Sequence, residues 1–160
     1  MSAKIEVQGL ERAVPFFIRK ARIGDIPEIF RIEVDSFIDP YAPFLLMNLL
    51  AMYPTGFLVA ESLGRVHGYV ICRQVGVKGH IIALAVDKTN RKSGVGAELL
   101  KKAENGLRDF GANGFWLEVR ESNYPAQFFY LKQGYNRLHT VSSYYDDGEC
   151  AEIFYKNFST

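Results

Sequence analysis

Hydrophobic residues along the chain fall into short apolar runs separated by stretches in which they recur at helical spacing. Continuous or alternating apolar runs of this length are typical of strands, and three- and four-residue spacing is typical of amphipathic helices. The pattern predicts strands over residues 16–20, 56–61, 66–75, 80–86, 115–119, 135–145 and 151–155, and helices over 25–38, 44–52, 95–110 and 123–134. Strands meander first and then alternate with helices, which favours one mixed sheet with helices on both faces.

Local signals set the ends of several elements. Asp25 can cap the first helix with Pro27 in its first turn, and this helix ends before Pro40 because the residue preceding a proline disfavours helical backbone. Gly111 follows the apolar stripe of the long third helix and ends it. The run over residues 80–86 is almost entirely apolar, so we expect both of its faces to be covered.

The segment after this run, Arg91-Lys92-Ser93-Gly94-Val95-Gly96-Ala97, predicts an anion-binding loop. It joins a buried strand to a helix start, where free backbone N–H groups and the helix dipole attract a phosphate and glycine permits close approach. No Lys-Ser or Lys-Thr follows Gly96, as a P-loop requires, and Leu99 stands where a dinucleotide fingerprint has glycine or alanine. A plain tight turn before a helix is the simpler alternative.

Composition narrows the possible functions. The chain has 160 residues with 19 basic and 18 acidic side chains, a net charge of +1. We expect a single domain over residues 1–160 with its core at about 16–158, and no nucleic-acid or membrane partner. Met1-Ser2-Ala3-Lys4 shows no secretory signal, and Cys72 and Cys150 lack metal-ligand spacing, so we expect a cytoplasmic location. The oligomeric state is left open.

Three further runs make the pattern specific. They are Leu117-Glu118-Val119-Arg120-Glu121-Ser122-Asn123, Phe129-Tyr130-Leu131-Lys132-Gln133-Gly134-Tyr135, and Tyr144-Tyr145-Asp146-Asp147-Gly148-Glu149-Cys150-Ala151. With the Arg-x-x-Gly-x-Gly loop, this ordered set resembles the N-terminal protein acetyltransferases of the GNAT superfamily, in the RimI and archaeal NatA-like branch. The resemblance implies an α/β (α+β) fold: a mixed seven-stranded sheet splayed between its fourth and fifth strands, where acetyl-CoA enters.

The same resemblance implies an activity and residue roles. The activity is acetyl transfer from acetyl-CoA to the free α-amino group of protein or nascent-chain N-termini, including ribosomal proteins, by direct attack in a ternary complex. The implied coenzyme contacts are Leu84, Ala85, Val86, Arg91, Lys92, Ser93, Gly94, Val95, Gly96, Ala97, Asn123, Tyr130, Leu131 and Lys132. The implied peptide contacts are Phe37, Asp39, Tyr41, Tyr144 and Tyr145.

For the chemistry, Glu118 and His80 are the candidate bases, acting through a water, and Tyr130 is the candidate proton donor to the leaving thiolate. A backbone N–H from residues 84–86 is the expected oxyanion donor. An α-amino group has a pKa near 8, against about 10.4 for lysine, so a weak base suffices. His80 and Glu118 could hold an adventitious zinc ion, but a stable site needs more ligands, so no metal is required.

Simpler interpretations stand beside these roles. Asn123 can be only a helix cap, Tyr130 a core residue, His80 a strand-end histidine, and Tyr144-Tyr145 an ordinary strand pair. The chain departs from the family pattern at Asp39, which stands in place of glutamate in the loop that shapes the pocket for the substrate's first side chain, and this leaves the preferred N-terminal residue open. It also departs at Cys150, in place of aspartate, to which we assign no function.

Two other functions remain open as alternatives. One is a GNAT enzyme for lysine side chains or small amines such as polyamines. The other is a non-catalytic acyl-CoA sensor, which would need neither Glu118 nor Tyr130. Ser2, exposed after methionine removal, is a candidate substrate within the chain itself.

Overall fold

A computed structural model describes residues 15–158 of the chain. Its strands are β1 Phe17–Lys20, β2 Phe57–Ser62, β3 Arg65–Val75, β4 Lys78–Val86, β5 Gly114–Arg120, β6 Asn136–Val141 and β7 Ala151–Asn157. Its helices are α1 Ile26–Ser36, α2 Pro43–Met52, α3 Val95–Asp109 and α4 Tyr124–Lys132, with short 3₁₀ turns at Ile23–Asp25 and Lys88–Asn90. Ser2 and the ends of the expected 1–160 domain lie outside the described residues.

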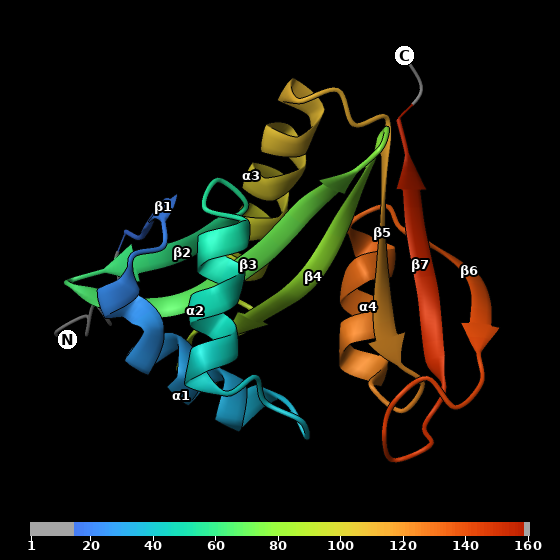
Figure 1. The fold of residues 1–160 in the computed structure, drawn as a ribbon, viewed down its shortest axis with the longest axis horizontal. Helices are drawn as coiled ribbons and strands as arrows, with labels where there is room; N and C mark the ends of the chain where they lie inside the picture. Colours follow the sequence, from blue (N-terminus) through green and yellow to red (C-terminus); the bar gives the residue numbers. More distant parts are fainter. Residues whose placement is uncertain (1–14, 159–160) are drawn as a thin grey trace, which may run out of the picture.

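The strands form one seven-stranded sheet in the order β1-β2-β3-β4-β5-β7-β6. All neighbours are antiparallel except β4 and β5, which run parallel and pair only at Gly79 with Phe115 and at His80 with Trp116. Beyond these pairs the two strands diverge, as Figure 1 shows between the green β4 and the brown β5. The predicted mixed sheet with a splay between its fourth and fifth strands is confirmed.

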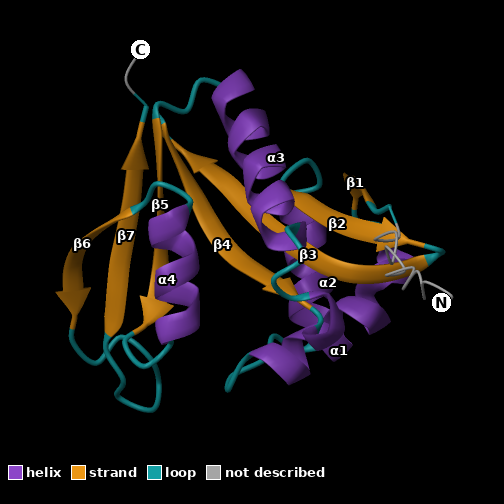
Figure 2. Cartoon of the chain, turned by 180° about the vertical axis from the view of Figure 1, so that it is seen from behind, coloured by secondary structure: helices purple, strands orange, loops and turns teal. Residues whose placement is uncertain are grey.

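Helices cover both faces of the sheet. One core cluster joins α1 and α2 to residues such as Val59, Tyr69 and Ile71, on the face toward the viewer in Figure 1. The other joins α3 and α4 to Val70, Ile81 and neighbouring residues, on the face seen in Figure 2. Within residues 15–158, no helix combines the length and the apolar character that crossing a bilayer requires.

Most element boundaries lie within two residues of the prediction, and the differences at the start of β4 and at the end of β6 have clear structural causes. β4 begins at Lys78 rather than at residue 80, because it forms a tight hairpin with β3 around Gly76, which has a φ of +58°. The strand expected to run to Tyr145 ends at Val141 instead. Ser143 takes a φ of +50°, and the Tyr145 N–H bonds to the carbonyl of Glu149 within the β6–β7 loop. The interpretation of Tyr144-Tyr145 as a strand pair is therefore wrong.

Candidate active site

A cavity of 370 Å³ lies where β4 and β5 diverge. It gathers predicted residues from five segments: Phe37, Asp39 and Tyr41 from the α1–α2 loop, Leu84 from β4, Glu118 from β5, Asn123 and Tyr130 from α4 and its cap, and Tyr144 and Tyr145 from the β6–β7 loop. Glu33 and Arg120, which the sequence did not single out, line it too.

Other predicted residues lie outside the cavity wall. Ala85 packs in the core under α1, and Val86 leads into the glycine loop. Leu131 is exposed, and the Lys132 ammonium lies 4.5 Å from the centre of the Phe128 ring. Since α4 runs back along β5, its last turn lies away from the open end of the splay (Figure 2), and neither Leu131 nor Lys132 joins the cavity.

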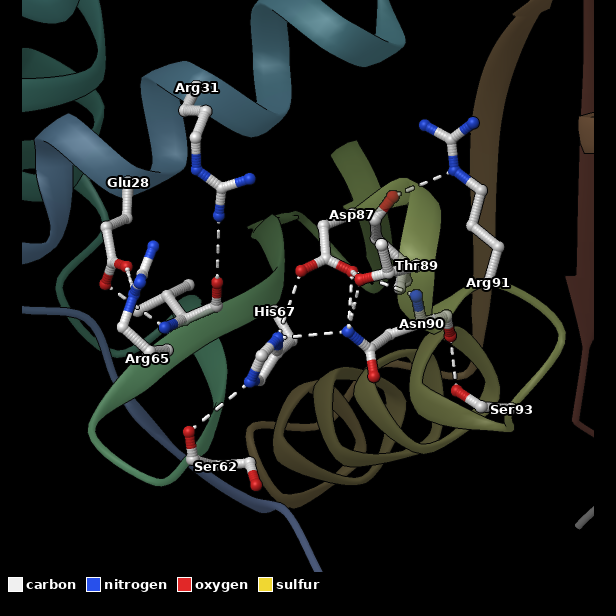
Figure 3. Close-up of polar contacts among 12 residues, drawn as sticks. Glu28, Arg31, Ser62, Arg65, His67, Asp87, Thr89, Asn90, Arg91 and Ser93 are labelled. Atoms are coloured by element: carbon white, nitrogen blue, oxygen red, sulfur yellow. Dashed lines mark hydrogen bonds and ion pairs between the residues drawn. The ribbon is translucent and has the colours of Figure 1, made fainter. Parts of the chain in front are cut away.

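Asp87 anchors the start of the glycine loop (Figure 3). Its carboxylate accepts hydrogen bonds from the backbone and side-chain nitrogens of Asn90, at 3.0 and 2.7 Å, and lies 3.0 Å from Nδ1 of His67. Burial acts to raise the pKa of Asp87, but the bonds from Asn90 and His67 outweigh it and hold that pKa below its usual value. The Ser93 hydroxyl donates to the carbonyl of Asn90, which closes the turn.

The loop's backbone suits a diphosphate. Gly94 caps α3 with a φ of +90°, a left-handed conformation that favours glycine. The first N–H groups of α3 have no partner within the helix, and the helix dipole adds positive potential there. Lys92 adds a cation at this end, whereas Arg91 is engaged elsewhere: it donates to the carbonyl of Val86 at 2.9 Å and to the hydroxyl of Ser36 at 3.0 Å.

The slot between β4 and β5 suits the arm of the coenzyme. Leu84, Leu117 and Ala126 give it apolar walls, and β4 residues beyond His80 no longer pair with β5, so that strand edge can bond to a ligand. Asn123 combines two predicted roles, since its Oδ1 accepts from the Ala126 N–H at 3.2 Å, capping α4, while its side chain lines the cavity.

Glu118 presents a carboxylate to the cavity, with His80 behind it. Oε2 of Glu118 lies 2.8 Å from Nε2 of His80. Trp116 stacks on the imidazole with ring centres 4.5 Å apart and planes within 6°. His80 is buried and does not line the cavity, so a substrate there meets Glu118 rather than the imidazole. Among residues 15–158, no group of three or more His, Cys, Asp or Glu side chains could hold a metal ion.

Tyr130 reaches the cavity from α4 and is almost fully buried. Its ring packs edge-on against Phe129 and Tyr135, with centres 5.1 and 5.6 Å away. Burial raises its pKa well above the usual value of a phenol. The hydroxyl therefore stays protonated and can donate a hydrogen bond, but it is a weaker acid than an exposed tyrosine.

Arg120, at the end of β5, joins the two loops of the cavity rim. It donates to Asp39 of the α1–α2 loop, and to Asp147 and Glu149 of the β6–β7 loop at 2.9 and 2.8 Å. Its guanidinium also lies 4.0 Å from the centre of the Tyr145 ring. Bonds from the Ser122 hydroxyl and from Arg120 lower the pKa of Glu149 to about 2. No local spacing in the sequence indicates these contacts between distant segments.

Glu33 holds the α1–α2 loop from below. It is buried on α1, where its carboxylate accepts the Tyr41 N–H at 2.9 Å and the hydroxyl of Tyr69. Burial raises the pKa of Glu33, against the effect of these two bonds. The available signal was its position beside Ile29 and Ile32 on the apolar face of α1, where a lone acid needs partners.

Comparisons with known proteins agree with this geometry. The profile of the Acetyltransferase (GNAT) family matches residues 26–135. An uncharacterized N-acetyltransferase of Methanocaldococcus jannaschii is 41% identical over 140 residues, covering 87% of this chain and 90% of that protein. An N-alpha-acetyltransferase of Sulfolobus acidocaldarius is 34% identical over 156 residues, covering 89% and 93%.

A solved structure is similar over nearly the same length. The crystal structure of Ard1 from Thermoplasma volcanium superposes with a TM-score of 0.86 at 27% identity, covering 91% of this chain and 99% of that one. The matched profile takes in the β4–α3 glycine loop, Glu118 and Tyr130. The chain therefore belongs to the Acetyltransferase (GNAT) family, whose acetyl donor is acetyl-CoA.

Proposed function

We propose that this protein transfers the acetyl group of acetyl-CoA to the free α-amino group at the N-terminus of proteins. The observation that carries the proposal is the meeting, in one cavity, of the Glu118 carboxylate at the splay with a tyrosine rim from two loops. Tyrosines combine apolar rings with hydroxyls that can bond to a peptide backbone. The name of the Sulfolobus relative, an N-alpha-acetyltransferase, supports the same activity.

Acetyl-CoA supplies a thioester carbonyl, and the residues of this chain position an amine against it. Glu118 accepts a proton from the incoming ammonium group, directly or through a water, which frees the nitrogen lone pair to form the new C–N bond. The C–S bond breaks, and its electron pair leaves with the coenzyme sulfur. An α-amino group, with a pKa near 8, needs less help from the base than a lysine near 10.4.

For Tyr130 we propose a role other than that of the proton donor expected from the sequence. Because burial raises its pKa, transfer of its proton to a departing thiolate is unfavourable, since an ordinary thiol has a pKa of about 8.5. We assign Tyr130 a hydrogen bond to the developing sulfur charge instead. The unpaired N–H groups along β4 are suited to bind the carbonyl oxygen as it gains charge.

Acidic groups at the cavity favour one second candidate, a small polyamine. Glu33, Asp39 and Glu118 all line it. Two of these are already engaged: Glu33 accepts from Tyr41 and Tyr69, and Asp39 pairs with Arg120. Glu118 pairs with His80 through Oε2 and keeps Oε1 for one ammonium group, which favours a single peptide amine over a polycation.

The test is transfer from labelled acetyl-CoA to a peptide panel whose first residue is Ser, Ala, Met or Glu. N-blocked, lysine-containing peptides and spermidine serve as controls. We expect label only on free α-amino groups, with the preferred first residue as a further result; ribosomal-protein N-termini belong in the panel because a Bacillus subtilis relative is named for one. Label only on blocked peptides or on spermidine would contradict the proposal and favour the alternative of a GNAT enzyme for lysine side chains or small amines. Binding of acetyl-CoA without any transfer would favour the non-catalytic acyl-CoA sensor.

A further inference from the structure

His80 makes contacts through both ring nitrogens, and Arg73 provides one of them. The two residues face each other in the antiparallel ladder of β3 and β4. Nε of Arg73 lies 3.1 Å from Nδ1 of the imidazole, while Nε2 lies 2.8 Å from Glu118. The Trp116 ring stacks on the imidazole and restrains its plane.

The chemistry of the partners fixes where the imidazole proton lies. A guanidinium has donors only, so Nδ1 of His80 must accept from Arg73; a carboxylate has acceptors only, so Nε2 must carry the hydrogen that bonds to Glu118. One neutral tautomer satisfies both contacts. An imidazolium would carry a hydrogen on Nδ1 as well, and this N–H would point at the N–H of Arg73, so that two donors would face each other.

We propose that Arg73 is a positioning residue that holds His80 neutral in this tautomer and leaves Glu118 as the group that accepts the substrate proton. His80 then has no free lone pair with which to act as a base. Oε2 of Glu118 takes the imidazole N–H, so Oε1 is left for the amine or a water. The identity of that amine rests on the proposed function; the tautomer does not.

Within residues 15–158, Arg73 is the cationic side chain that hydrogen-bonds to His80. Arg73 comes from β3, and Glu118 and Trp116 come from β5. The segment after α2 contributes Tyr53, whose hydroxyl lies 3.4 Å from the Arg73 guanidinium. The β6–β7 loop contributes Tyr144. Without Arg73, Nδ1 of the imidazole would lose the N–H donor that opposes a second proton on the ring. An imidazolium beside the carboxylate would stabilise its negative charge and weaken it as a base.

The first test is side-chain ¹⁵N NMR of the full chain at about neutral pH, which reports which nitrogen of each imidazole carries hydrogen. We expect His80 to show a bare Nδ1 and a protonated Nε2. His67 is the internal comparison: its Nε2 lies 3.3 Å from the carbonyl of Ser62, and its Nδ1 lies 3.0 Å from the Asp87 carboxylate and 3.1 Å from the side-chain nitrogen of Asn90, so its neighbours are uncharged or anionic groups and not a guanidinium. A protonated Nδ1 on His80 in the wild-type protein would overturn the proposal without any activity measurement.

Two variants separate the hydrogen bond from a structural role. Arg73→Met removes the donor, whereas Arg73→Gln keeps an N–H donor without the charge. We expect kcat/KM of the Met variant to fall about tenfold further near pH 6 than near pH 8, and the Gln variant to keep the wild-type profile shape. An equal loss at every pH in the Met variant would mark Arg73 as merely structural. Should the Met variant fail to fold, the wild-type spectrum and the Gln profile still decide.

Discussion

Two histidine–carboxylate pairs in this molecule have similar distances but different neighbours around the imidazole ring. His67 lies 3.0 Å from Asp87 below the coenzyme loop, and His80 lies 2.8 Å from Glu118 at the splay. The second nitrogen of His67 faces the carbonyl of Ser62, whereas that of His80 faces the guanidinium of Arg73. A pair distance alone therefore says little about charge, because the group on the far side of the ring decides it.

The difference matches what each end of β4 must do. An imidazolium at His67 would add positive charge beneath the loop that receives the phosphates, and its Asp87 partner also holds Asn90. A neutral His80 leaves the Glu118 carboxylate free to take a proton. We therefore expect changes at the Asp87 end to alter coenzyme binding and changes at the Glu118 end to alter turnover.

The largest effect is expected from Glu118→Gln. Its side chain keeps the shape and a hydrogen-bonding oxygen but loses the basic carboxylate, so kcat should fall by about 10²–10⁴-fold. Acetyl-CoA affinity, measured by calorimetry, should change little. Glu121→Gln, three residues further along and exposed, is the matched control. Near-normal turnover in Glu118→Gln would mean that Glu118 is not the base and that the two histidine–carboxylate pairs do not differ in function as inferred.

The next largest effect is expected from Arg120→Gln, which leaves both histidine–carboxylate pairs intact. It removes the contacts to Asp39, Asp147 and Glu149 that join the two rim loops. A loss of about 1.4 kcal/mol in peptide binding corresponds to a tenfold higher peptide KM. We expect the acetyl-CoA KM to stay constant in the same steady-state experiment.

Arg137→Gln is the control for the rim variant, because it also removes an arginine–carboxylate pair, with Glu152 on β7. Equal effects of the two arginine variants on peptide KM would mean that Arg120 acts through general stability rather than through the rim.

The sequence predicted those parts of the site that a single segment determines. The glycine loop, the polar Glu118 in an apolar strand and Asn123 at a helix start can each be recognised locally, and the structure places them around the splay. Arg73 and Arg120 could not be recognised in this way. Their importance comes from strand register and from loops that meet only in the folded chain.

The wrong strand assignment of Tyr144-Tyr145 has the same origin. Tyr144 and Tyr145 have strand-like residue types, yet hydrogen bonds within the β6–β7 loop hold them outside β6. Arg91 has the charge expected at a phosphate loop, and its role there stays a prediction; two of its five N–H donors bond to Val86 and Ser36 in the folded chain. Residue type and spacing indicate which groups are available, and tertiary contacts determine which remain free.

Asp87→Asn should produce a smaller effect, on acetyl-CoA binding rather than on turnover. The amide keeps the shape but weakens the bonds to Asn90 and His67, and a loss of about 1 kcal/mol would raise the acetyl-CoA KM about fivefold. Turnover at saturating acetyl-CoA should remain near that of the wild type. Asp109→Asn, at the opposite end of α3, is the matched control. A drop in kcat without a change in acetyl-CoA KM would show that the two ends of β4 do not divide the work as inferred.

The smallest expected effect is on stability against pH. Burial acts to raise the pKa of Asp87, but bonds from Asn90 and His67 place it below the usual 3.8, while the unfolded chain titrates near that value. The unfolded state therefore binds a proton first as the pH falls, so the stabilisation is fully present above about pH 4 and is lost on further acidification. Urea unfolding of the wild type and of Asp87→Asn should give free energies that differ at neutral pH and converge below pH 4. A difference that stayed constant across this range would mean that the Asp87 charge does not stabilise the loop, and the anchoring would then come from shape and neutral hydrogen bonds alone.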